Sequence, residues 1–302
     1  MIDLLADEER YSDTTLTRGN STVTLLANTY GLRTFALEYP RYIHSELMTH
    51  RVFSRNARSS RAVPVERLIY EAECDYVTPS VVYQNCRGMT GKEKLDPNKW
   101  RLFIMAWHEA RVSAVEAAKK MDALGVHKQH INRILEPYTR IKTIVTGDDF
   151  DNFYKLRLAP DAEPEMQNLA KLMREAEDID TYRGRYSNGV HLIEGPEVDR
   201  DDFFVSAPFV TAEEFSKLDL IDILKVSGAR CARVSYSNHD GTTPDIQRDL
   251  KLADELLKNG HMSPFEHPCI HYPEKKTSHY NLSDWASFRY LYETKRLAVL
   301  KP

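Results

Sequence analysis

The chain has 302 residues, of which 42% are hydrophobic and 28% are charged, and its net charge is −4. This composition is that of a globular protein with a substantial core, and the acidic total argues against a protein devoted to duplex nucleic acid. Four scattered cysteines without a CxxC pair argue against a disulfide framework or a cysteine zinc site. We find no signal-peptide pattern and no apolar run of membrane-spanning length, so we expect a cytoplasmic protein without a membrane partner.

The N-terminal half predicts one hairpin followed by helices. Two β-rich runs within residues 21–37 flank a turn at Asn28–Gly31, which predicts a β-hairpin. Apolar residues at helical spacing then predict a helix over residues 42–58. Pro97 near its start and Gly125 just past its end delimit a long helix over residues 96–123. The same spacing predicts further helices over residues 128–135, 149–158 and 163–177.

The C-terminal half begins with a polar stretch. Residues 178–210 are rich in Gly, Pro and Asp, which predicts a linker or a long loop. Helices are expected over residues 212–217, 218–227 and 245–258, the last of which stops at Asn259–Gly260. A short strand is expected over residues 269–272 and a final helix over residues 283–297. The mixture predicts an α+β fold, with an antiparallel or mixed sheet flanked by long helices.

Four arginines are concentrated within residues 50–61. On a helix, Arg51, Arg55 and Arg58 share one face, and Arg61 continues it or lies just past its end. One guanidinium group can donate two parallel hydrogen bonds to two oxygens of a phosphate or a carboxylate, so this stripe of arginines predicts an anion site. Two alternatives remain open: a solvated face with structural ion pairs to Glu46 and Glu66, and a DNA-reading helix, which the acidic total disfavours.

A second motif covers residues 260–267. Ser263 as N-cap, Pro264 at the first position and Glu266 at the third predict a capping box that opens a short helical turn. His261, Glu266 and His267 also suggest metal ligands. Their spacing matches no standard zinc motif, however, so we expect no metal.

Two more fragments are uninformative alone. Residues 232–236 (Ala-Arg-Val-Ser-Tyr) have the character of a short strand, and Arg133 precedes Pro137 by four residues. A helix with Asn152 and Leu156–Arg157 follows. Together with His50–Arg51, Ser59 and Arg61, these fragments and residues 260–267 resemble the flavin-dependent thymidylate synthases, which have an Arg-His-Arg signature, an ARVSY-type strand and a GHxSPFEH-type turn.

The resemblance implies FAD as cofactor, with methylenetetrahydrofolate and NADPH as co-substrates. It implies catalytic roles for Arg157 and Ser59, with Arg157 at the base. The positions that correspond to flavin contacts are His50, Arg51, Asn152, Ser235, Ser263 and Glu266. The positions that correspond to nucleotide contacts are Ser59, Ser60, Arg61, Arg133 and Arg157. A homotetramer with active sites shared between subunits is also expected, with a pyrimidine deoxynucleotide as ligand and no nucleic acid.

The motif order differs from that of the family, because the ARVSY-type and GHxSPFEH-type fragments stand at the C-terminus. A circular permutation gives this order, and the arrangement is similar to phage-encoded members that supply pyrimidine nucleotides for viral DNA. We therefore expect one domain over residues 1–302. Its parts are an arginine-helix half (1–177), a linker or insert (178–226) and the half with the two other motifs (227–302).

Several positions depart from the family pattern. Thr49 replaces the first arginine of the signature, Glu46 stands where a glutamine is usual, and Ala57 where a glutamate is usual. Asp148 and Asp161 occupy an arginine and a histidine position near the flavin. Lost cations and added acids are expected to reshape flavin binding, and changes near the base to alter which pyrimidine is accepted.

The activity expected first is transfer of one carbon to C5 of dUMP, which gives dTMP. One alternative is C5 hydroxymethylation of dUMP or dCMP for viral DNA modification. The other is a nucleotide-binding or nucleic-acid-binding protein that has lost catalysis.

Overall fold

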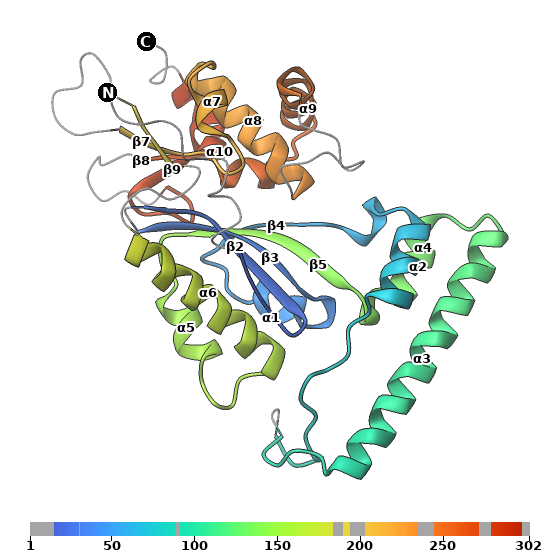
Figure 1. Cartoon of the computed structure of the whole chain (residues 1–302). Coiled ribbons are helices and arrows are strands. Elements are labelled where there is room, and N and C mark those ends of the chain that lie inside the picture. Colours follow the sequence, from blue (N-terminus) through green and yellow to red (C-terminus); the bar gives the residue numbers. More distant parts are fainter. Residues whose placement is uncertain are drawn as a thin grey trace.

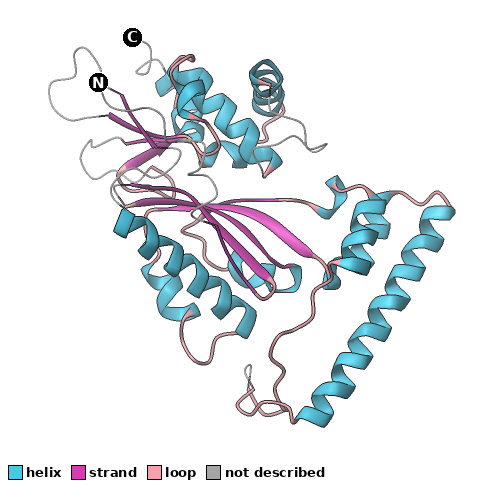
Figure 2. Cartoon of the chain, in the orientation of Figure 1, coloured by secondary structure: helices cyan, strands magenta, loops and turns pink. Residues whose placement is uncertain are grey.

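Two antiparallel sheets organise the chain, with helices on both sides of the larger one (Figures 1 and 2). The computed structural model describes residues 15–29, 31–88, 91–183, 190–193, 203–234, 245–271 and 279–297. The larger sheet has the order β1-β2-β3-β5-β4, with the bounds β1 Thr15–Arg18, β2 Ser21–Thr29, β3 Leu32–Pro40, β4 Ser54–Ala57 and β5 Arg140–Gly147. The smaller sheet consists of β6 Val190–Ile193, β7 Phe203–Ser206, β8 Cys269–His271 and β9 Trp285–Ser287. The predicted α+β class is confirmed.

The predicted hairpin is confirmed as β2 and β3. Gly31 at the turn has φ +81°, a conformation that glycine adopts without steric cost. Helices α5 (Asp151–Arg157) and α6 (Pro164–Arg183) confirm two further predictions, and Figure 1 shows both on one face of the sheet. Between sheet and helices lies an aromatic core in which the rings of Phe53 and Phe150 stack with centroids 4.4 Å apart. The sheet therefore holds α5 through apolar burial.

The helix predicted over residues 42–58 is wrong. The chain there forms a 3-10 turn η1 (Arg41–Ile43), a short helix α1 (His44–Met48) and then strand β4. β4 pairs with β5 over four residues, and the 3-10 turn η2 (Ser60–Ala62) follows it. The backbone N–H and C=O groups of β4 form their hydrogen bonds with β5, and not within the helix that the apolar spacing predicts. The four arginines therefore share no helical face.

A helical subdomain extends from this edge of the sheet. Its elements are α2 (Val65–Cys74), α3 (Pro97–Ala123), α4 (Lys128–Ile131) and the 3-10 turns η3 (Asn132–Ile134) and η4 (Glu136–Tyr138). The prediction for α3 is confirmed: the Asp96 side chain accepts hydrogen bonds from the backbone N–H groups of Asn98 and Lys99. Only Val115 and Ala118 are buried along its 27 residues, and Figure 1 shows α3 projecting away from the sheet. The described residues therefore leave much of its surface uncovered.

The C-terminal helices cover the smaller sheet. They are α7 (Ala212–Phe215), α8 (Leu220–Arg233), α9 (Ile246–Lys258) and α10 (Phe288–Glu293). The helices predicted to begin at residues 212 and 245 are confirmed, and Gly260 ends α9 with φ +74°. Residues 203–226 are not a loop or linker, because they form β7, α7 and half of α8 and bury Val205 and Leu224 in a second core. Residues 184–189 and 194–202 lie outside the described residues.

Three local predictions in this half need correction. Ala232 and Arg233 end α8, and Val234 follows in the left-handed region with φ 57°, so the predicted strand does not form there; Ser235 and Tyr236 lie outside the described residues. The predicted capping box is wrong: the 3-10 turn η5 (Ser263–Glu266) begins at Ser263 itself, so Met262 stands at the N-cap position and no side chain caps the turn. The Ser263 hydroxyl donates to Asn56. Residues 283–297 contain β9 and the short α10 rather than one helix.

A buried ion network stabilises α8. The fully buried Arg230 guanidinium donates to Asp249 of α9 at 2.8 Å and to Glu214 at 2.6 Å. A buried charge is tolerated only when such partners compensate its lost hydration. Among the described residues, no helix combines the length and the apolar composition that crossing a bilayer requires.

The contact between α8 and η5 gives a test of this packing. A Cβ atom added at Gly228 would lie 2.4 Å from Cδ1 of Phe265, a fully buried ring. We expect Gly228→Ala to lower the free energy of unfolding by about 1–3 kcal/mol despite the higher helix propensity of alanine. Thermal unfolding measures this, with the exposed Ser113→Ala of α3 as control. An unchanged midpoint in Gly228→Ala would show that the helix and the turn are not in this contact.

Candidate functional site

The edge strand β4 gathers most of the predicted site residues. His50 precedes the strand, Ser59 to Arg61 follow it, and η5 lies beside it although about 200 residues separate the two in sequence. The residues fall into three groups, which we call the Arg157 group, the Glu136 group and the η5 group. Pairing of β4 with β5 thus positions all three.

The Arg157 group joins α1 to the end of α5. The Arg157 guanidinium donates from Nε to Nε2 of His50 at 2.9 Å and from Nη1 to Oε2 of Glu46 at 3.0 Å. Its Nη2 donates to the Glu46 carbonyl at 3.3 Å and to Oγ1 of Thr49 at 3.2 Å. The guanidinium is therefore fixed in direction, with four hydrogen bonds to three residues that lie about 110 positions away in sequence.

His50 is held in its neutral form. Burial, followed by the positive charges of Arg157 and Arg55, lowers the pKa of His50 to about 4. Because Nε2 accepts from Arg157, the ring proton is on Nδ1. The ring packs on Phe53 and edge-on against Phe153, with centroids 5.9 and 5.0 Å away. His50 therefore acts as an acceptor that orients Arg157.

The Glu136 group lies at the other end of β4. Oε1 of Glu136 accepts from Oγ of Ser60 at 2.6 Å and from Nη1 of Arg133 at 3.3 Å, and the Arg41 guanidinium lies 3.9 Å away. Ser59 Oγ accepts from the backbone N–H of Arg61 and begins η2. The carboxylate thus holds a hydroxyl and two guanidinium groups together, which are donors suited to a phosphate.

The η5 group connects the C-terminal half to β4. Ser263 Oγ donates to Oδ1 of Asn56 at 3.1 Å, and the Asn56 amide donates to the Cys231 carbonyl at 2.8 Å. Glu266 pairs with Arg289 at 2.6 Å. Asn56 therefore fixes both η5 and the end of α8 against the edge strand.

Three predicted residues point into solvent. Arg51, Arg61 and Asn152 are exposed, and their side chains form no hydrogen bond or ion pair with the described residues. Ser235 lies outside those residues. Within the same part of the chain, no group of three or more His, Cys, Asp or Glu side chains is placed to hold a metal ion. Arg51 and Arg61 therefore carry positive charges near β4 that no carboxylate of the described residues neutralises.

Sequence reasoning missed three residues that organise these groups: Glu136, Asn56 and Arg41. Glu136 stands three positions after Arg133, a spacing that brings side chains together on a helical turn and that the sequence does show. Asn56 and Arg41 act through partners distant in sequence, so no local pattern marks them. Arg55, which seemed part of the anion stripe, donates to the carbonyls of Met48 and His50 and fixes the turn before β4.

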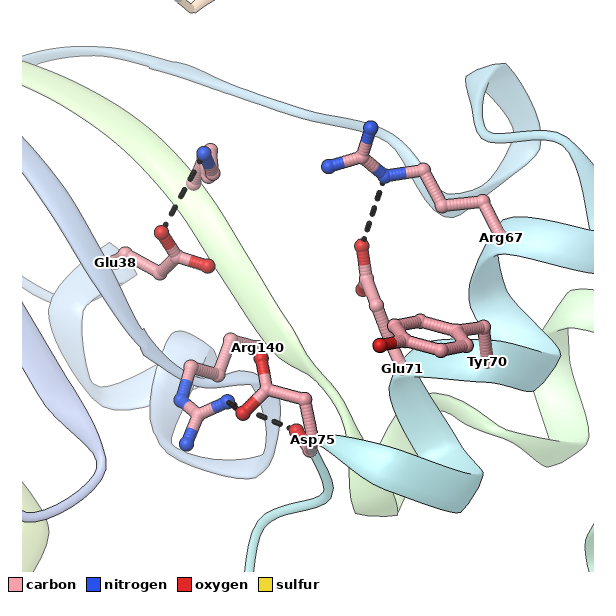
Figure 3. A pocket seen from close by; sticks show the side chains of 7 residues that line it. Glu38, Arg67, Tyr70, Glu71, Asp75 and Arg140 are labelled. Carbon is pink, nitrogen blue, oxygen red and sulfur yellow. Dashed lines mark hydrogen bonds and ion pairs between the residues drawn. The ribbon is translucent and has the colours of Figure 1, made fainter.

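A cavity of about 340 Å³ lies between α2 and strands β3 and β5 (Figure 3). Its lining consists of Glu38, Arg67, Tyr70, Glu71, Asp75, Arg140 and Lys142. The six charged side chains form three ion pairs, such as Arg140 with Asp75 at 2.8 Å. The cavity therefore has no excess positive charge for an anion, and no predicted site residue lines it.

Comparison with known proteins places the chain in a family. The family model described as thymidylate synthase complementing protein matches residues 18–178, which is more than half of the chain. This match includes the Arg157 and Glu136 groups and ends before the η5 group. No curated protein matches the chain significantly.

Solved structures with some similarity include two of the UMP/dUMP methylase PolB from Streptomyces cacaoi. The complex with 5-Br UMP has 15% identity and a TM-score of 0.42, and covers 54% of this chain and 90% of that chain. The complex with 5-Br dUMP has 17% identity and a TM-score of 0.38, and covers 49% and 66%.

A third such structure is the flavin-dependent thymidylate synthase ThyX from Helicobacter pylori complexed with FAD and dUMP. It has 19% identity and a TM-score of 0.32, and covers 48% of this chain and 67% of that chain. All three TM-scores are below 0.5, so the assignment rests on the family match and not on these structures. With more than half of its length matched, this chain belongs to the thymidylate synthase complementing protein family.

Proposed function

We propose that this protein catalyses flavin-dependent transfer of one carbon from methylenetetrahydrofolate to C5 of a deoxypyrimidine monophosphate. The observation that carries the proposal is the gathering of the family's motif residues along β4, including Ser263, which the family match does not cover. For the family as a whole the base is uracil and the product is dTMP, and the base taken by this chain depends on the residues beside Arg157.

In this proposal the nucleotide lies between the Arg157 and Glu136 groups. Arg157 faces the base, where its fixed positive charge stabilises the negative charge that develops on the pyrimidine during attack at C5. Arg133, Ser59, Ser60 and Arg61 face the phosphate. Arg133 is more than half exposed and its contact with Glu136 is 3.3 Å long, so exchange of the carboxylate for a phosphate costs little.

The residues present fit FAD by the chemistry of their donors and acceptors. The exposed Arg51 supplies a free cation for the pyrophosphate, while Ser263, Glu266 and Asn152 supply hydrogen-bonding groups. His50 orients Arg157 beside this surface. When bound, reduced flavin supplies the hydride, with NADPH as the proposed source of electrons.

We also propose that the chain is a circular permutation of the usual family order. Contact of η5 with β4 supports this, because it brings the two halves of the motif set together despite their reversed order in sequence. The resemblance to phage-encoded members points to a role in supplying nucleotides for viral DNA.

A second candidate function is C5 hydroxymethylation, with dUMP or dCMP as substrate. The observation that favours a changed substrate is the carboxylate of Glu46, which contacts Arg157 where the family usually has a glutamine. A carboxylate only accepts hydrogen bonds, whereas a glutamine amide both donates and accepts. The edge of the base is therefore expected to meet different hydrogen-bond donors and acceptors in this chain from those in the usual family member.

Association of copies into a homotetramer with shared sites completes the proposal. Leu102, Met105 and Val112 lie on one face of α3 and are 66%, 64% and 45% exposed. Such an apolar helix face is unusual on a monomer, and a second copy of this chain is the occupant that we propose.

Loss of Arg157 tests the catalytic role. We expect Arg157→Ala to lower the rate of tritium release from C5-tritiated dUMP or dCMP at least about a hundredfold, because the charge facing the base is removed. Arg18→Ala, which breaks an exposed pair with Glu175, is the control. Equal release by Arg157→Ala and wild type would contradict the assignment, and absence of release from any form of the FAD-loaded protein would favour a non-catalytic binding protein.

Disruption of the α3 face tests the assembly. Met105→Glu places a charge in the proposed contact, so we expect it to reduce the mass measured by light scattering after size-exclusion chromatography. Lys171→Glu, which reverses an exposed charge on α6 instead of α3, should keep the wild-type mass. A wild-type protein that elutes as a monomer would refute the assembly.

A further inference from the structure

Glu46 occupies the one position in the Arg157 group where a negative charge reaches the proposed base site. Its Oε2 accepts from Nη1 of Arg157, and its side chain is 34% exposed. No hydrogen bond or ion pair from the described residues reaches Oε1 of Glu46. A free acceptor oxygen therefore stands beside a fixed donor.

Two neighbours set the charge beside this oxygen. Arg157 pairs with the Glu46 carboxylate, and His50, being neutral, adds no second cation. Thr49 uses its hydroxyl hydrogen on the Glu46 carbonyl at 2.7 Å and so has none left for the carboxylate. The ion pair of Glu46 and Arg157 thus presents one acceptor next to one donor and has no net charge.

Cytosine and uracil differ in what they offer to such a pair. Cytosine has an amino group at C4, which donates to a carboxylate, and an acceptor at N3, which suits a guanidinium. Uracil has one N–H at N3, set between two carbonyl oxygens. A carboxylate brought to that N–H also faces both oxygens, which repel it. A glutamine removes this repulsion, because its amide accepts from N3–H and donates to O4.

We propose that Glu46 is the base-selecting residue of this protein and directs it to cytosine nucleotides. The proposal rests on the proposed function, in which Arg157 faces the base. The Arg157 guanidinium then holds N3 of cytosine while Oε1 of Glu46 accepts from the amino group. Glu46 acts on the choice of base, and Arg157 on binding and chemistry.

Calorimetric titration of the FAD-loaded full chain with dCMP and with dUMP tests this. We expect wild type to bind dCMP at least about tenfold more tightly than dUMP, the size of one well-made base contact. Glu46→Gln should shift the ratio of the two dissociation constants toward dUMP by about tenfold or more. Glu46→Asp keeps an acceptor-only carboxylate and should retain the preference for dCMP.

Glu175→Gln, which removes one carboxylate from an exposed ion pair on α6, is the matched control and should keep the wild-type ratio. An equal ratio in wild type and Glu46→Gln, or tighter binding of dUMP by wild type, overturns the role of Glu46 and leaves the proposed function intact. The same shift in Glu46→Asp as in Glu46→Gln overturns the acceptor argument. If neither nucleotide binds wild type, the inference and the proposed function both fail.

Discussion

The pairing of β4 with β5 is the constraint on which the rest of the site depends. Four residues of an edge strand are enough to set the direction of the chain on both sides. On one side the turn before β4 buries Phe53 in the aromatic core and brings His50 to Arg157. On the other side the chain enters η2 and brings Ser60 to Glu136. An edge strand is normally left open or covered, and here the turn η5 covers it.

Electrostatic balance is the second principle of the site. Three cations of the site have a carboxylate partner: Arg157 has Glu46, Arg133 has Glu136, and Arg289 has Glu266. Such pairs orient guanidinium groups that would otherwise sample many rotamers, so a ligand meets them already placed. The uncharged Thr49, which stands where the family has an arginine, fits this balance because it hydrogen-bonds to Arg157 instead of repelling it.

Elements whose signals are local were predictable from the sequence. The hairpin of β2 and β3, the capped helix α3 and the end of α9 at Gly260 each carry their own turn or cap residues. The segment after Pro40 was not predictable, because hydrogen bonds to β5, about 90 residues away, decide between helix and strand there. Ser263 shows the same limit: its sequence context indicates a cap, but the folded turn begins at Ser263 itself, and its hydroxyl donates to the Asn56 side chain. Site residues were recognised through family resemblance, whereas Glu136 and Asn56 required the folded chain.

The central claim is that the protein adds one carbon to C5 of a pyrimidine nucleotide. Its most direct test is the mass of the nucleotide recovered after incubation of the FAD-loaded protein with dUMP or dCMP, methylenetetrahydrofolate and NADPH. The account predicts a gain of one methylene group, or of one methylene and one oxygen if hydroxymethylation is the outcome. Recovery of both nucleotides with unchanged mass, from a protein that binds FAD and nucleotide, would contradict it.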